Sequence, residues 1–166
     1  MIRLFWIPFV VGFAGCAPGG SQPRFESTPE LLRLFGGEQN RTAVQHAYSS
    51  SYLSQKDKAG PVLYVDNRVG RLSDILGRSS SYDWTKPVDG ALELDRDIRI
   101  EFTGEAYWKA ENSGAKGSPV VVYLDRKRQV LEVQVDDKRQ GRASYSPAAA
   151  RLERFFAEIG VDPMSP

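Results

Sequence analysis

Residues 120–135, with the sequence VVVYLDRKRQVLEVQV, decide the fold of this chain. The segment holds two runs rich in β-branched residues, Val120 to Leu124 and Val130 to Val135, separated by the polar residues 125–129. Within each run apolar side chains recur at every second position, which is typical of a strand with one buried face. The spacing of the runs and the polar turn predict an antiparallel β-hairpin.

Strand-like alternation also occurs upstream of the hairpin. Over residues 92–102, leucine, isoleucine and phenylalanine alternate with aspartate, glutamate and arginine, so we expect one face to pack and the other to meet water. Arg96 interrupts the pattern, and we expect a bend or turn there between two short strands. Pro61 to Asp66 is a further predicted strand, because β-branched and aromatic residues dominate it.

Polar composition predicts irregular structure in three places. Residues 38–59 are ambiguous, with a possible strand over Thr42 to Tyr48 and a loop around Ser49 to Ser51. Residues 78–90 and residues 136–145 are expected to be loops, because serine, glycine, proline and charged residues dominate them.

Capping residues predict a short N-terminal helix over residues 29–35. Ser27 or Thr28 can cap it, Pro29 suits its first turn, and the two glycines that follow suit its end. A second short helix is predicted over residues 71–77, with its leucine and isoleucine side chains facing inward.

The strongest helix signal lies at the C-terminus, over residues 146–160. We expect Ser146 to cap this helix, Pro147 to start it and Gly160 to end it. Its apolar side chains follow the i, i+3, i+4, i+7 spacing, which predicts a stripe that covers one face of the sheet. The stripe consists of Leu152, Phe155, Phe156 and Ile159.

The order of these elements predicts an α+β fold. A mainly antiparallel sheet should carry a short N-terminal helix and a C-terminal amphipathic helix packed on it. The chain of 166 residues is long enough for one domain, which we place over residues 28–162 with a short tail over 163–166. Hydrophobic residues make up 41% and charged residues 26%, which argues against disorder throughout.

The chain begins with MIRLFWIPFVVGFAGC, residues 1–16. Arg3 supplies a positive charge ahead of an apolar run of about ten residues. That run has the size of a signal-peptide core and is too short for the roughly 20 residues of a transmembrane helix.

Residues 13–16, FAGC, resemble the lipobox of bacterial lipoprotein precursors, in which small residues precede an acylated cysteine. The family usually has an aliphatic residue where this chain has Phe13. The resemblance implies that residues 1–15 are a lipoprotein signal peptide, that Cys16 is lipidated, and that residues 16–27 form a flexible tether. The alternative is an ordinary cysteine near a generic signal cleavage site.

The same resemblance implies a location in the bacterial cell envelope. The protein would attach to the membrane through acylated Cys16. Ala17 stands where aspartate would favour the inner membrane in well-studied members of the family, so we expect the outer membrane, facing the periplasm. The resemblance covers residues 1–16 only and implies nothing about the remainder of the chain.

Composition excludes several kinds of site. Lys and Arg total 22 against 21 Asp and Glu, a balance that argues against a general nucleic-acid binder. One cysteine excludes an intramolecular disulfide, and a single histidine, His46, excludes any site with two imidazoles. No G-x-S-x-G motif surrounds His46 and no D-x-[DN]-x-[DN]-G loop is present. We therefore expect no enzymatic activity, no cofactor and no metal.

Four aromatic residues form the first candidate binding surface: Tyr82, Trp84, Tyr107 and Trp108. They lie in or beside segments predicted to be loops, and tyrosine and tryptophan are enriched at binding interfaces. The alternative is that these rings cap the ends of a small core.

A basic run at the predicted hairpin tip is the second candidate. Arg126, Lys127 and Arg128 could contact the phosphates of anionic lipid or lipopolysaccharide. The alternative is a solvated turn.

Together these features predict a membrane-anchored module that binds another macromolecule. Its partner would be an envelope protein, and its role either envelope assembly and maintenance or the neutralisation of a hydrolase by an immunity-type inhibitor. A small lipid- or glycan-binding protein is the alternative, and it requires an apolar cavity between the sheet and the last helix.

Overall fold

The computed structural model describes residues 26–45, 50–57, 62–64, 67–103 and 119–163. Its helices are α1 (Pro29–Phe35), α2 (Glu38–Gln45), α3 (Asn67–Leu76) and α5 (Ala149–Glu158), with short 3₁₀ helices η1 (Ser79–Ser81) and η2 (Ser146–Ala148). Its strands are β1 (Ser50–Gln55), β2 (Val62–Tyr64), β3 (Ile98–Thr103), β4 (Val120–Asp125), β5 (Val130–Val135) and β6 (Lys138–Ser144).

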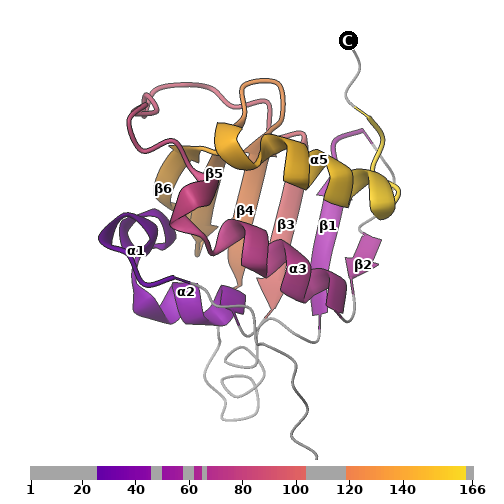
Figure 1. Ribbon diagram of the computed structural model, residues 1–166, viewed down its shortest axis with the longest axis horizontal. Coiled ribbons are helices and arrows are strands. Elements are labelled where there is room, and N and C mark those ends of the chain that lie inside the picture. The colour runs from indigo at the N-terminus through magenta and orange to yellow at the C-terminus, as the bar shows by residue number, and fades with distance from the viewer. Residues whose placement is uncertain (1–25, 46–49, 58–61, 65–66, 104–118, 164–166) are drawn as a thin grey trace, which may run out of the picture.

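The described strands form one sheet in the order β2-β1-β3-β4-β5-β6, and every neighbouring pair is antiparallel (Figure 1). The α+β class is confirmed. The predicted hairpin over residues 120–135 is confirmed as β4 and β5, with Val120 opposite Val135 and Asp125 opposite Val130. The strand predicted over Pro61 to Asp66 is present as β2.

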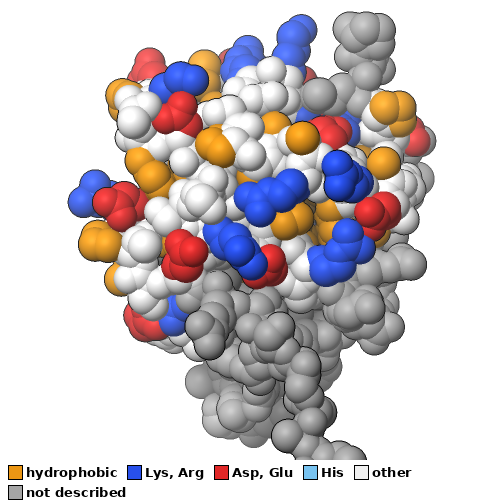
Figure 2. All heavy atoms as spheres, in the orientation of Figure 1, with side chains coloured by type: hydrophobic (Ala, Val, Ile, Leu, Met, Phe, Trp, Pro, Cys, Tyr) orange, Lys and Arg blue, Asp and Glu red, His pale blue; other side chains and the backbone are white. Residues whose placement is uncertain are grey.

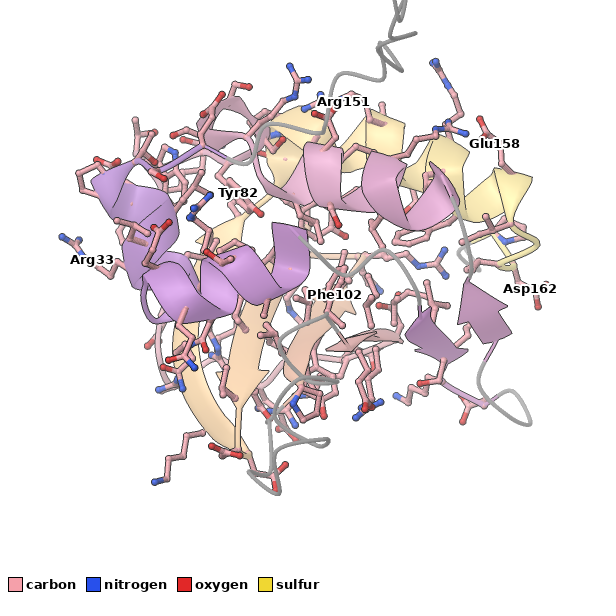
Figure 3. The ribbon with its side chains drawn as sticks, turned by 90° about the horizontal axis from the view of Figure 1, so that it is seen from below. Arg33, Tyr82, Phe102, Arg151, Glu158 and Asp162 are labelled. Atoms are coloured by element: carbon pink, nitrogen blue, oxygen red, sulfur yellow. The ribbon has the colours of Figure 1, made fainter. Side chains whose placement is uncertain are left out.

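Helices α1, α2, α3 and α5 all lie on one face of the sheet (Figure 3). The alternation of the strands explains this arrangement, because every second side chain of β3, β4 and β5 points into the helical layer. The opposite face carries mainly polar side chains, which point away from the helices in Figure 3. The strands and helices contribute the following buried side chains to the core: Leu53, Ile98, Ile100, Phe102, Val122, Leu124, Leu131, Val133, Leu34, Phe35, Leu72, Leu76, Leu152, Phe155 and Phe156.

The N-terminal helix forms where the sequence predicts it. The Oγ1 of Thr28 accepts a hydrogen bond from the N–H of Leu31 at 3.4 Å, and Pro29 occupies the first turn. Gly36 ends α1 with a left-handed φ of 73°, a conformation that glycine adopts without strain. The prediction of a helix over residues 71–77 is also confirmed, although α3 begins earlier, at Asn67.

The chain enters this layer at Glu26, ahead of α1. The N–H of Glu26 donates to the carbonyl of Gly77 at 2.8 Å, and its carboxylate accepts from the N–H of Ser79 at 2.8 Å. The first described residue is therefore fixed to the helical layer just beyond α3.

The C-terminal helix buries Leu152, Phe155 and Phe156, as its spacing predicts. The expected cap is wrong, because Ser146 lies inside η2 and its side chain caps no N–H of α5. The backbone tightens into 3₁₀ turns there instead, and α5 begins three residues later. Gly160 follows the helix with a φ of 81°.

The possible strand over Thr42 to Tyr48 is wrong, since residues 38–45 form α2. Val44 faces the core while the Nδ2 of Asn40 donates to the carbonyl of Phe35 at 2.9 Å. Packing of one helical face decides this segment, because its strand propensity is weak. Ser50 and Ser51, expected in a loop, begin β1.

The polar loop expected over residues 136–145 is also wrong, because β6 occupies most of it. Asp136 and Asp137 both have positive φ angles, 51° and 57°, and form a two-residue turn between β5 and β6. Such turns match the twist of an antiparallel pair and favour Asp, Asn and Gly. The alternation over residues 92–102 gives one strand instead of the two expected, because β3 begins only at Ile98. The expected interruption at Arg96 is present, since this residue has a φ of 24°.

Candidate functional site

A cavity of about 300 Å³ lies at the edge of the sheet between α1, residues 83–88 and β6. We call it the Trp84 groove, after the aromatic residue in its wall. Leu34, Pro87 and Val88 give the groove an apolar lining, and Arg33 and Lys86 add positive charge. Trp84, one of the four aromatic candidates, therefore lines an accessible cavity.

The indole of Trp84 is fixed in orientation. Its Nε1 donates to both the carbonyl and the Oγ of Ser79, each at 3.0 Å. Its ring packs on Tyr82 with the centroids 4.9 Å apart and the planes tilted by 40°. Because its polar atom is already satisfied, the exposed part of the ring is available for apolar contact.

Tyr82 packs against the Trp84 ring from the core side and does not itself reach the surface. Its side chain is 4% exposed, and its hydroxyl donates to the carbonyl of Leu76 at 2.7 Å. Burial raises the pKa of Tyr82, so the phenol stays protonated. For this residue the alternative role as a core cap is the one observed. Tyr107 and Trp108 lie outside the described residues, as do Cys16 and His46.

The wall formed by β6 depends on Gly141. A Cβ at this position would lie 2.8 Å from both the Cα and the carbonyl oxygen of Leu34, closer than such atoms approach in proteins. The missing side chain therefore lets α1 pack directly on β6. This close approach sets the spacing between two walls of the Trp84 groove.

Arg142 fixes the third side of the groove from the polar face of the sheet. Its Nη1 donates to the carbonyls of Asp89, Gly90 and Leu92, at 3.1, 3.2 and 2.7 Å, and so holds the loop that follows Val88. Its Nε donates to the Oε2 of Glu132 at 2.6 Å. Arg142 thus joins this loop to the middle of β5.

Glu132 is the anchor of this arrangement and is 1% exposed. Its carboxylate also accepts from Arg96 Nη2 at 2.8 Å and from Gln134 Nε2 at 2.6 Å. Burial alone would raise the pKa of Glu132, but the hydrogen bonds from Arg142 and Gln134 and the nearby positive charges hold it below its ordinary value. Glu132 is therefore ionised at neutral pH.

The basic run is not a uniform surface patch. Arg126 is 4% exposed, and its Nε donates to Asp97 at 3.0 Å while its Nη1 donates to the carbonyl of Asp162 at 3.0 Å. This internal bonding withdraws Arg126 from any anionic surface. Lys127 is exposed, and Arg128 pairs with the buried Asp125 at 2.6 Å while remaining half-exposed.

Charges of both signs cover the helical face. Figure 2 shows Lys and Arg side chains interspersed with Asp and Glu side chains over α3 and α5. The ion pairs Arg71–Glu158, at 2.7 Å, and Arg78–Asp74, at 2.8 Å, account for part of this mixture.

Sequence reasoning missed Glu132 and Gly141, and it missed the structural role of Arg142. Glu132 could have been noticed, because a carboxylate in the middle of the apolar run VLEVQV must meet a partner if it is buried. Nothing in the segment 138–144 points to Arg142 as that partner before β6 is recognised as a strand.

The described residues form a small two-layer α+β domain, and the indole of Trp84 is held in a groove at one edge of its sheet. No family model matches the chain, and no curated protein or solved structure matches it significantly. Within the described ranges, no group of three or more His, Cys, Asp or Glu side chains could hold a metal ion. None of the described helices is long and apolar enough to cross a bilayer.

Proposed function

We propose that this chain is a lipid-anchored envelope protein whose domain binds another protein through the Trp84 groove. The observation that supports it is the fixed indole of Trp84 beside an apolar cavity of about 300 Å³. Rigid aromatic side chains in preformed pockets are typical anchors of protein interfaces, because little conformational freedom is lost on binding.

The proposed role is non-enzymatic, as an envelope assembly or maintenance factor or as an immunity-type inhibitor. The groove lining offers Asp83 and Glu30, but Asp83 already accepts from Thr85 and pairs with Lys86 at 3.1 Å. This arrangement suits binding better than proton transfer, since no nucleophile beside a base is among these side chains.

Small lipid or glycan binding is less well supported. That function calls for a cavity between the sheet and the C-terminal helix, and the Trp84 groove has no lining residue from α5. The helical face of the sheet is filled by buried side chains such as Phe155 and Phe156, which pack edge to face at 5.9 Å.

In-cell crosslinking tests the proposed interaction. The tagged, lipidated protein is crosslinked, purified in detergent and analysed by mass spectrometry, in parallel with Trp84→Ala and with the control Lys138→Ala. We expect a stoichiometric envelope protein with the wild type and the control, and its loss with Trp84→Ala. Recovery of the same partner with all three proteins would exclude the Trp84 groove as the binding site.

Lipidation has a separate test. Cys16→Ala should abolish incorporation of labelled fatty acid and release or mis-process the protein. Fractionation of the wild type between inner and outer membranes tests the proposed outer-membrane location. A normal mass and normal membrane extraction of the Cys16→Ala variant would refute the proposed anchor and leave the groove experiment unaffected.

A further inference from the structure

A second cavity, of about 710 Å³, lies at the end of the sheet where β4 turns into β5. Its walls come from three segments: Lys56 after β1, residues 93–96 before β3, and residues 127–128 in the β4–β5 turn. We call it the basic groove. None of these residues lines the Trp84 groove, so the two cavities are separate sites.

A buried carboxylate holds the walls of the basic groove together. Asp125 has no exposed surface, and it accepts from the N–H of Asp95 at 3.1 Å, from the N–H of Arg128 at 2.9 Å and from Arg128 Nη1 at 2.6 Å. The N–H of Lys56 donates to the carbonyl of Asp97 at 2.9 Å, which fixes the remaining wall. The groove is therefore preorganised, and a ligand would meet little loss of conformational freedom.

Cationic side chains outnumber carboxylates in the exposed lining of the basic groove, by four to two. Lys56 forms an ion pair with the exposed Asp95, whereas the carboxylates that pair with Arg96 and Arg128 are buried. Lys127 has no ion-pair partner among the described residues. The cationic lining residues are Lys56, Arg96, Lys127 and Arg128, and the acidic ones are Glu93 and Asp95.

Arg96 is held in a conformation that its own backbone disfavours. Its φ is 24°, which is strained for a residue with a side chain, and such strain persists only where the surroundings fix it. Its guanidinium lies 4.6 Å from the ring centroid of Tyr123 and donates Nη2 to Glu132 at 2.8 Å. A guanidinium has five N–H donors, so donors remain for a ligand at the half-exposed side chain.

We infer that the basic groove binds an acidic segment of a protein, whose aspartate or glutamate carboxylates meet Arg96, Lys127 and Arg128. Guanidinium groups recognise carboxylates through paired hydrogen bonds, and their fixed position here favours that geometry. The site itself rests on the contacts described above. The choice of a protein ligand over a lipid headgroup rests on the proposed function.

The position of Arg96 relative to the proposed anchor supports that choice. Glu26, where the described chain begins, is bonded within the helical layer, whereas Arg96 stacks on Tyr123 on the opposite face of the sheet. The proposed anchor precedes Glu26, so Arg96 lies on the face of the sheet opposite to the layer that holds this attachment. Acidic protein is therefore a better match than the headgroups of the anchoring membrane.

The probe for this site is a short fluorescein-labelled oligoglutamate peptide. It is titrated against the lipidated mature chain in phosphatidylcholine nanodiscs, with empty nanodiscs as the blank. The groove variant is Lys56→Glu/Lys127→Glu, and the matched control is Lys138→Glu/Arg154→Glu. Both variants reverse two exposed charges and change the net charge equally, so general electrostatic attraction falls equally in both.

We expect the wild type and the control to bind the peptide with similar affinity, and the groove variant to bind about tenfold more weakly. Binding should also weaken as salt is added. Trp84→Ala should bind the peptide like the wild type. Loss of peptide binding at the basic groove is therefore distinguishable from loss of a protein partner at the Trp84 groove.

Two results would overturn the inference. The first is that the groove variant and its charge-matched control bind the peptide with equal affinity. Absence of binding by all of the proteins counts as this result. The second is stronger binding to phosphatidylglycerol vesicles than to the peptide, with the same dependence on Lys56 and Lys127, which would assign the groove to lipid phosphates.

Discussion

Gly141 of β6 and Leu34 of α1 approach so closely that a Cβ on Gly141 would lie 2.8 Å from the Leu34 Cα. The clash would involve backbone atoms on both sides, so a side-chain rotation could not relieve it. The contact joins two elements separated by most of the chain, and it brings α1 against the strand that forms the second wall of the Trp84 groove.

Gly141→Ala should therefore destabilise the protein by about 1–3 kcal/mol, the usual range for overpacking. Urea unfolding followed by circular dichroism measures this change. Gly90→Ala is the matched control, because a Cβ there meets only the Arg139 guanidinium at an ordinary 3.6 Å. Equal stability of the two variants would contradict the proposed close packing of α1 on β6.

Glu132→Gln should reduce the free energy of unfolding by about 3 kcal/mol, because it leaves a largely buried Arg142 without its anionic partner. Glu158→Gln removes an exposed ion pair with Arg71 and should change stability by no more than about 0.5 kcal/mol. Urea unfolding at neutral pH compares the two. A small effect of Glu132→Gln would mean that the network around β5 contributes little to stability.

The same residue predicts how stability depends on pH. The folded-state pKa of Glu132 lies below its ordinary value of 4.5, so its contribution to stability is fully present above that value. The contribution is lost as the pH falls through the lower folded-state pKa. Between neutral pH and a pH of about 3, the free energy of unfolding should therefore fall more steeply for the wild type than for Glu132→Gln. Urea unfolding at each pH measures it. Parallel curves would show that Glu132 does not carry this dependence.

Neighbouring residues in the basic run should behave differently. Arg126→Ala removes a buried guanidinium and leaves the partly exposed carboxylates of Asp97 and Glu153 without their shared partner, and we expect a loss of about 1–3 kcal/mol. Lys127→Ala removes an exposed side chain and should change stability by less than about 0.5 kcal/mol. Thermal unfolding of both variants, measured side by side, distinguishes a structural residue from a surface one.

Much of the fold was predictable because burial leaves a period in the sequence. The hairpin over residues 120–135 and the stripe of α5 follow the periods of a strand and a helix. Strand β6 was not predictable in this way, since its sequence KRQGRAS has almost no apolar residue. An edge strand pairs on one side only, and here Arg142 fixes β6 through hydrogen bonds to Glu132 and to the carbonyls of Asp89, Gly90 and Leu92.

The candidate site was predictable only in part. Aromatic content pointed to Trp84 but could not separate it from Tyr82. The two residues lie close together in an irregular segment, and only the folded structure buries one ring beneath the other. The basic run has the same problem. Arg126 and Lys127 are adjacent, yet the twist of the turn buries the first against Asp97 and exposes the second. Such differences arise from contacts with segments far away in sequence.

The attachment of Glu26 to Gly77 and Ser79 also limits how far the proposed anchor lets the domain travel. If the stretch between Cys16 and Glu26 is the flexible tether that the sequence predicts, its root-mean-square length would be roughly 17 Å. A partner in the same membrane leaflet would then meet the Trp84 groove at an effective concentration in the millimolar range, on the order expected for short flexible linkers. This contact could accordingly be weak in free solution and still be occupied at the membrane, so soluble fragments would underestimate the interaction.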